Sequence, residues 1–181
     1  MAVASNKHPR NQPHTAATTK RGFPAKWLWW AAVSVLLVVL LWPALRAQYY
    51  IRSGVEAAPS QVAWRTAYPT ALEEAKAAEK PLLLVFSASW CPPCQLMKHE
   101  VWPDAEVGRL ANAGYVPVLL DPLPNQDIAE QYGVEYIPAV LIVSGEERVL
   151  GQAGAMSVRE ARRFLAEHGA PTGAPISRLA S

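Results

Sequence analysis

Cys91 and Cys94 are the only two cysteines of the 181-residue chain, and Pro92 and Pro93 separate them. On the first turn of a helix, this spacing would bring the two sulfurs within reach of a disulfide. The apolar run over 82–86 has the length of a strand buried on both faces, and it ends shortly before the pair. Proline is tolerated in the first turn of a helix, where its missing N–H would have no partner.

A pair of thiols at the N-terminus of a helix could carry redox chemistry. Unpaired N–H groups and the positive end of the helix dipole favour a thiolate at Cys91, so we expect its pKa to lie below that of a free thiol. Such a pair can switch between two thiols and a disulfide, and it can pass that state to another protein through a mixed disulfide. The two prolines stiffen this loop and remove two N–H donors that could otherwise stabilise the thiolate.

Other uses of the two sulfurs are weighed by the residues around them. Haem attachment is excluded because Gln95, and not histidine, follows the second cysteine. Zinc would need two further ligands, and two of the four histidines lie within the first fourteen residues. A structural disulfide would more often join distant segments. A copper carrier stays open, because Met97 and His99 add soft and imidazole ligands, and so does a redox-inert binding module.

A second informative segment is Ile137-Pro138, which directly precedes an apolar run over 139–143. A proline at this place cannot supply a hydrogen bond to a sheet, and it often marks a tight turn with a cis peptide bond. An ordinary trans proline at the start of a strand is the alternative.

Strand and helix patterns alternate along the chain and end in a hairpin. This order predicts a compact α/β domain with a mixed central sheet flanked by helices. Thr70 with Glu73, and Ser157 with Glu160, are capping-box signatures. Pro117 suits an edge strand or a bulge. We expect strands over 82–86, 115–120, 139–143 and 148–150, and helices over 70–80, 94–101, 104–112, 125–132 and 157–169.

Nineteen residues without a charge lie between Lys26 and Arg46. As a helix they would span about 28 Å, close to the hydrocarbon thickness of a bilayer. Tryptophans stand at both ends of the run, as is typical of membrane interfaces. The sequence therefore predicts one transmembrane helix over 27–45. A buried core helix would need a polar face or a shorter run, and a cleaved signal peptide usually has an apolar region of only about 7–15 residues.

Charge is distributed unevenly around this run. Residues 1–26 carry five basic residues and no acid, whereas the chain from Arg46 onward carries twelve basic residues against fifteen acids. The positive-inside rule then places the N-terminus in the cytoplasm and the rest outside, as a single-pass protein of the inner membrane with a periplasmic domain. A basic tail without a basic folded face argues against nucleic-acid binding. We expect a disordered tail over 1–26, a linker over 46–63, the domain over 64–169 and a flexible tail over 170–181.

These motifs together resemble the thioredoxin family. Their order and spacing match from about Leu72 to His168. Further residues before and after the cysteines resemble the thioredoxin-like C-terminal domain of the bacterial transmembrane disulfide reductases. The matching segments are Trp90-Cys91-Pro92-Pro93-Cys94, Ile137-Pro138 and Gly154-Ala155-Met156-Ser157 for the family, and Lys80-Pro81-Leu82, Ser89-Trp90-Cys91 and Pro103-Asp104-Ala105-Glu106-Val107 for those reductases.

The resemblance implies a thioredoxin-like fold and a membrane-tethered thiol–disulfide oxidoreductase whose only redox group is the Cys91–Cys94 disulfide. Cys91 matches the exposed attacking cysteine, and Cys94 matches the resolving cysteine. Pro138 matches the cis-proline that packs against the disulfide, and isoleucine before it is usual in reducing members. The implied partners are protein thiols and disulfides outside the cytoplasm, with a membrane electron donor or acceptor.

The resemblance also implies a substrate groove. Ile137, Gly154 and Ala155 match the backbone that lines it, and Trp90 matches its rim.

Two positions depart from the family's pattern. Cytosolic thioredoxins keep a buried aspartate and a partner lysine that help to move the proton of the second thiol, and here these positions are Val85 and Pro117. We therefore expect the buried proton relay to be missing. Asp121 is the nearest acid that could replace it, although a turn residue at a strand end is the plainer interpretation.

Overall fold

The computed structural model describes residues 25–169. Most of the predicted tail over 1–26 and the predicted tail over 170–181 lie outside the described residues. Residues 25–40 and the residues from Leu41 onward form two units, and each is described by itself.

Helix α1 (Ala25–Ser53) contains the predicted transmembrane run. Its stretch from Lys26 to Ser53 is long and apolar enough to cross a membrane. Large apolar side chains along 27–42 are exposed, and such a surface is stable only when something other than water covers it. The helix continues to Ser53, so the residues that the sequence assigned to the start of the linker are helical. Within the second unit, Ala47 on this extension is buried and Arg46 pairs with Glu100 at 2.6 Å.

A four-stranded mixed sheet in the order β2-β1-β3-β4 forms the centre of the second unit, as predicted. The first strand pairs in parallel with the second and antiparallel with the third, and the last two form a hairpin. The strands are β1 (Leu82–Phe86), β2 (Val116–Leu120), β3 (Ala139–Val143) and β4 (Val149–Ala153).

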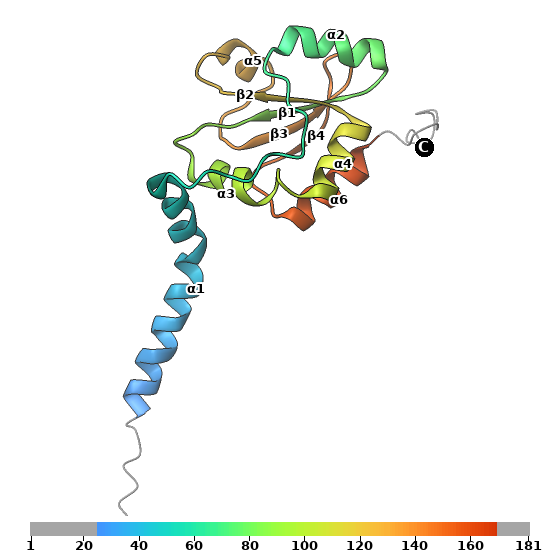
Figure 1. Cartoon of the computed structure of the whole chain (residues 1–181). Coiled ribbons are helices and arrows are strands. Elements are labelled where there is room, and N and C mark those ends of the chain that lie inside the picture. Colours follow the sequence, from blue (N-terminus) through green and yellow to red (C-terminus); the bar gives the residue numbers. More distant parts are fainter. Residues whose placement is uncertain (1–24, 170–181) are drawn as a thin grey trace, which may run out of the picture. The chain divides into compact units, whose positions relative to one another are not determined.

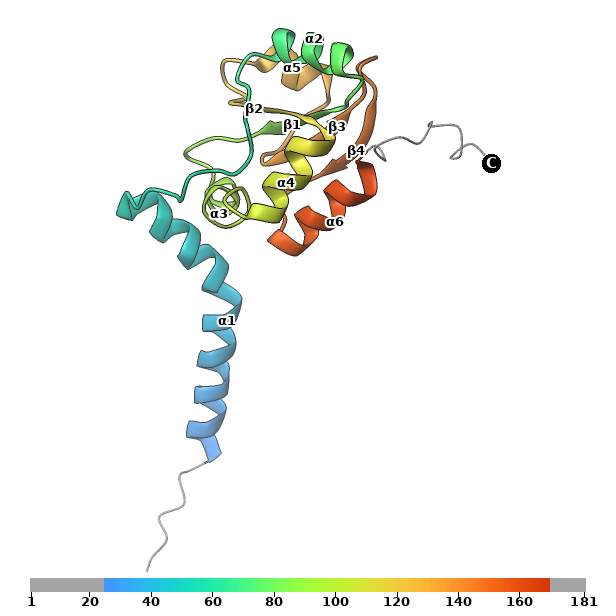
Figure 2. The same ribbon diagram turned by 45° about the vertical axis from the view of Figure 1, so that its right-hand side comes forward.

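Five helices cover the two faces of this sheet (Figures 1 and 2). On one face lie α2 (Tyr68–Ala78) and α5 (Gln126–Gln131), and on the other lie α3 (Pro92–Glu100), α4 (Ala105–Gly114) and α6 (Val158–His168).

Strand β1 explains why both faces can be covered. Its five apolar side chains alternate between the faces, and none is more than 1% exposed. Leu82, Leu84 and Phe86 pack with α2 and α5, whereas Leu83 and Val85 pack with α3, α4 and α6. Because β1 is held from both sides, the loop that follows it starts from a fixed position.

Strand β2 lies at the edge of the sheet, which is where Pro117 was expected. The carbonyl oxygen of Pro117 accepts a hydrogen bond from the Arg65 backbone at 2.9 Å, so a short segment before α2 covers part of this edge.

Two of the predicted helix starts are confirmed and one is wrong. Asp104 caps α4, and Ser157 with Glu160 forms the expected capping box of α6. The predicted box at Thr70 does not exist, because α2 begins earlier, with Pro69 in its first turn and Ala67 as an N-cap that has no side-chain hydrogen bond. Proline is pre-organised for the first turn of a helix, and this moves the start ahead of Thr70.

Candidate active site

Cys91 and Cys94 form a disulfide at the N-terminus of α3. Their Cα atoms lie 5.2 Å apart, within the usual range for such a bond. Cys91 is the N-cap residue, and its Sγ accepts a hydrogen bond from the Cys94 N–H at 3.3 Å. The predicted placement of the pair on the first turn is confirmed, with the helix beginning at Pro92 instead of Cys94.

Hydrogen bonds hold the loop between β1 and α3 in place. The Cys91 N–H donates to the carbonyl oxygen of Ala88 at 3.3 Å, and the Gln95 side chain donates to the same oxygen at 3.3 Å. The Gln95 N–H in turn donates to the Cys91 carbonyl at 3.1 Å. These contacts fix Cys91 relative to the end of the buried strand.

The Ile137–Pro138 peptide bond is cis, as the sequence suggested. It brings the Ile137 carbonyl oxygen to 3.6 Å from the Cys91 Sγ, and the Ile137 side chain packs against Ala88 and both cysteines. A reduced Cys91 could therefore donate its S–H to this carbonyl. The cis turn and the cysteine pair, more than 40 residues apart in the sequence, form one site.

The segment before the cis turn is anchored from the opposite face of the sheet. Tyr132 at the end of α5 is buried, and its hydroxyl is hydrogen-bonded to the Tyr68 hydroxyl, which also donates to Glu147 at 3.0 Å. Burial and the bond to Tyr132 raise the pKa of Tyr68, so both phenols stay neutral. Gly133 follows with a φ of +61°, which lets the chain turn away from the helix towards Pro138.

The cysteines are less accessible than expected. The resemblance implied an exposed Cys91, but in the disulfide form Cys91 is 3% exposed and Cys94 is 1% exposed. Two contacts account for this: the disulfide holds the sulfur of Cys91 against Cys94, and Ile137 packs over the pair.

The other predicted site residues lie at different places around the cis turn. Trp90 is 58% exposed beside the cysteines, as a rim residue would be. A Cβ atom at Gly154 would lie 3.8 Å from the Pro138 carbonyl, so Gly154 is close to the cis turn. Ala155 instead lines a second pocket of about 230 Å³, together with Ala153, Met156 and residues of α6.

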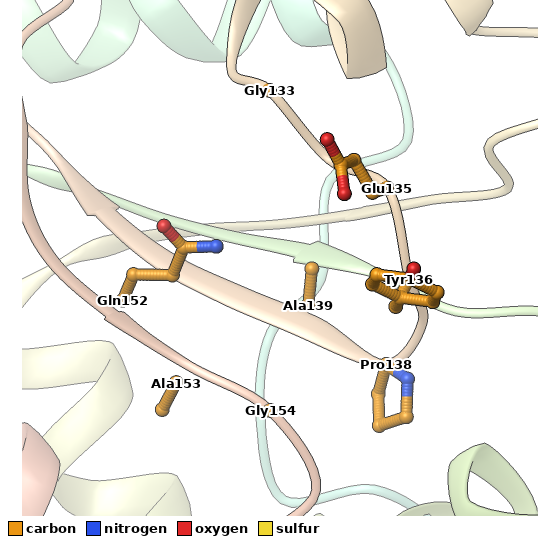
Figure 3. Close-up of a pocket in the computed structure, with 8 residues that line it drawn as sticks. All are labelled: Gly133, Glu135, Tyr136, Pro138, Ala139, Gln152, Ala153 and Gly154. Atoms are coloured by element: carbon orange, nitrogen blue, oxygen red, sulfur yellow. The ribbon is translucent and has the colours of Figure 1, made fainter.

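A pocket of about 410 Å³ lies beside the cis turn (Figure 3). Two residues of the predicted substrate groove, Pro138 and Gly154, line it. Its remaining lining residues were not predicted as site residues: Gly133, Glu135, Tyr136, Ala139, Gln152 and Ala153.

Comparisons with known proteins agree with this geometry. A family profile described as thioredoxin-like matches residues 63–145. Thioredoxin H4 of Arabidopsis thaliana is 32% identical over 84 residues, which cover 46% of this chain and 68% of that protein. The chain belongs to the thioredoxin family.

Solved structures of this family superpose on the same part of the chain. A thioredoxin from Thermus thermophilus matches with a TM-score of 0.53 and 26% identity, covering 59% of this chain and 86% of that one. A structure titled DsbH oxidoreductase matches with a TM-score of 0.50 and 25% identity, covering 60% and 88%. The fold, the family and the disulfide identify this thioredoxin-like protein as a thiol–disulfide oxidoreductase.

The proton relay of cytosolic thioredoxins has no counterpart among the described residues of this thioredoxin-like domain. Val85 is 1% exposed and packs with Met97, Val140 and other apolar side chains. Asp121 lies in a turn after β2, where its carboxylate accepts a hydrogen bond from the Leu123 N–H at 2.9 Å. Cys94 therefore contacts apolar groups, and deprotonation of its thiol would depend on water or on the substrate.

The two further ligands of the copper hypothesis, Met97 and His99, contact other residues in this structure. Met97 is 2% exposed and lies in the apolar core between the sheet and helices α3, α4 and α6. The His99 ring stacks on the ring of Tyr50, with centroids 4.0 Å apart. Burial and the neighbouring Lys98 lower the pKa of His99. In the described part of the chain, Met97 and His99 thus have partners of their own.

Proposed function

We propose that α1 anchors this thioredoxin-like protein in the cytoplasmic membrane and that its domain reduces disulfides of proteins on the extracytoplasmic side. Cys91 is the attacking cysteine and Cys94 the resolving cysteine. The observation that carries the proposal is the cysteine pair at the start of α3, with the cis Ile137–Pro138 turn 3.6 Å from the attacking sulfur.

The reaction has two exchange steps. The Cys91 thiolate attacks one sulfur of a substrate disulfide, forms a mixed disulfide and releases the other substrate sulfur as a thiolate. The Cys94 thiolate then attacks the Cys91 sulfur, releases the substrate's second thiolate and leaves the Cys91–Cys94 disulfide. Two electrons pass from the pair to the substrate, and a membrane electron donor must reduce the pair again before the next cycle.

Residues around the cysteine pair would assist this reaction by stabilising the thiolate and by contacting the substrate. The helix N-terminus and the Cys94 N–H at 3.3 Å stabilise negative charge on the Cys91 sulfur. The backbone of Ile137 and the residues Pro138 and Gly154 offer a substrate segment a surface beside that sulfur. Trp90, exposed next to Cys91 in the chain, would extend this surface, and Ala155 follows Gly154 at its border.

The membrane location is supported by charge and composition. The run over 27–45 has no charge, and the five basic residues before it favour a cytoplasmic N-terminus. Outside the cytoplasm, protein disulfides form and persist, so substrates for a disulfide reductase are present there. A tether confines the domain to substrates and donors at the membrane and raises their effective concentration.

A trapping experiment tests the chemistry. In the full-length protein, Cys94→Ala removes the resolving thiol, and we expect mixed disulfides between Cys91 and substrate proteins to accumulate in cells. Cys91→Ala is the matched control, because it leaves the more buried Cys94 as the only thiol and should capture little. Equal capture by both variants, or none by either, would contradict the assigned roles.

Direction and location need a second pair of measurements. A reductase keeps its pair mostly as dithiol in cells, whereas a disulfide donor keeps it oxidised, so quenching cells with acid and alkylating the free thiols distinguishes them. For location, a membrane-impermeant thiol reagent added to intact spheroplasts should label the Cys94→Ala variant at Cys91. The same reagent should not label Ser5→Cys in a chain that lacks both native cysteines. If the reagent labels position 5 and not Cys91, the N-terminus lies outside the cytoplasm, and the proposed orientation is wrong.

A further inference from the structure

The pocket beside the cis turn has a distinctive set of walls. Pro138, Ala139, Ala153 and Gly154 supply small or apolar surface, and three longer polar side chains stand around it. Figure 3 shows Glu135 and Tyr136 on the loop before the cis turn and Gln152 on β4. Glu135 is the only charged residue among those that line the pocket, and Tyr136 is 83% exposed.

The pocket shares the cis turn with the attacking sulfur. The Ile137 carbonyl lies 3.6 Å from the Cys91 Sγ, and the next residue, Pro138, is already a wall of the pocket. In an extended peptide, side chains two positions apart point to the same face at a spacing of roughly 6.6 Å. When a substrate cysteine is joined to Cys91, a side chain two residues away in the substrate would therefore come within reach of the cis turn, which forms one wall of this pocket.

The three polar side chains match one substrate side chain better than others. A carboxylate such as that of Glu135 can accept two parallel hydrogen bonds from a guanidinium. An exposed aromatic ring such as that of Tyr136 attracts a flat cation onto its face. The amide oxygen of Gln152 offers one more acceptor. A lysine would use the charge of Glu135 but would lose the planar fit, and a glutamate would be repelled.

We propose that Glu135, Tyr136 and Gln152 form a specificity pocket that selects protein substrates with an arginine two residues from the reacting cysteine. This inference rests on the proposed function, because it describes how the same site chooses its substrates. The pocket stabilises the encounter complex and the mixed disulfide with such substrates. It does not change the chemistry of the sulfur exchange.

The test uses full-length protein in detergent, with its cysteine pair reduced. Its oxidants are peptide dimers joined by a single disulfide, identical except for arginine, lysine, glutamine or glutamate two residues before or after the cysteine. The measurement is the second-order rate constant of each dimer. A partly exposed ion pair changes a rate constant or a binding constant by up to about fivefold. We expect the arginine dimer to react up to about fivefold faster than the glutamine dimer, and the glutamate dimer to be slowest.

Three variants assign the preference to residues. Glu135→Gln should lower the arginine-to-glutamine ratio, leaving only the smaller contributions of Tyr136 and Gln152. Glu130→Gln is the matched control, because it removes the same charge from an exposed position on α5 that does not line the pocket, and it should keep the ratio. Tyr136→Leu should slow the arginine dimer more than the lysine dimer, because lysine gains less from the ring.

The outcomes separate the inference from the proposed function. Equal rates for all dimers in the wild type, or a preference for arginine that is undiminished in Glu135→Gln, would overturn the specificity pocket and leave the proposed oxidoreductase function intact. Failure of every dimer to oxidise the wild-type pair would overturn the proposed function, and the pocket with it.

Discussion

Replacement of Pro93 by alanine should make the Cys91 thiolate markedly more stable. Cys91 is the N-cap of α3, and Pro92 and Pro93 occupy the next two positions. An N-cap side chain accepts hydrogen bonds from the N–H groups of the second and third helical residues. The second residue here is Pro93, which has no N–H, so Cys94 is the one donor of these two that reaches the sulfur, at 3.3 Å.

The size of the effect follows from the restored donor. A hydrogen bond to a charged group contributes about 1.5–3 kcal/mol, and about 1.4 kcal/mol changes the ratio of thiolate to thiol tenfold. We expect Pro93→Ala to lower the pH at which half of Cys91 is ionised by about one unit. Near neutral pH the reduced form then gains roughly 1 kcal/mol, which makes the pair about 20 mV more oxidising.

Ultraviolet absorbance of the thiolate against pH measures the first quantity, and equilibration with glutathione measures the second. Pro92→Ala is the matched control, because it relaxes the same loop but restores an N–H at the first helical position, which does not point at the N-cap side chain. If Pro92→Ala and Pro93→Ala shift both quantities equally, the change comes from loop flexibility, and the reasoning about the missing donor is wrong.

Two further predictions concern stability. Hydrogen bonds from Arg162 and from the Val107 N–H lower the pKa of Asp104 below its usual 3.8, so this carboxylate stabilises the fold above about pH 4 and its contribution is lost as the pH falls through the lowered pKa. Urea unfolding should therefore show a deficit of Asp104→Asn at pH 7 that shrinks in acid, and a constant deficit would argue against the ion pair. Leu141→Ala, at a fully buried position of β3, should cost about 2–5 kcal/mol without moving the titration of Cys91.

The core of the site was predictable because its signals are local. Two cysteines separated by prolines after a buried strand can adopt few arrangements, and the start of α3 provides the expected one. A proline at the entrance to an apolar strand indicated a cis bond before Pro138 with a trans proline as the alternative, and the structure has the cis form. The alternation of β1 between two apolar cores was likewise implied by its uninterrupted apolar run.

What escaped prediction depends on register and packing. Gln152 reaches the pocket because it pairs with Leu141 across a hairpin whose register shifts next to Ile142. No periodicity in the sequence reveals such a shift. Tyr136 stood next to a predicted site residue, and a large aromatic beside a cis turn was a signal that could have been used. The burial of Cys91 depends on Ile137, a contact across more than 40 residues.

The two sulfurs have unequal surroundings, and this bears on the order of events. Cys91 lies at a helix N-terminus and receives an N–H, so its thiolate is supported at the moment of attack. Cys94 is 1% exposed among Ala88, Ile137 and Cys91, and Val85 occupies the sequence position at which cytosolic thioredoxins keep the aspartate of the proton relay. Burial without a partner disfavours a thiolate. Attack should therefore outpace resolution, and the mixed disulfide should live long enough for contacts beyond the sulfurs to decide which substrates stay.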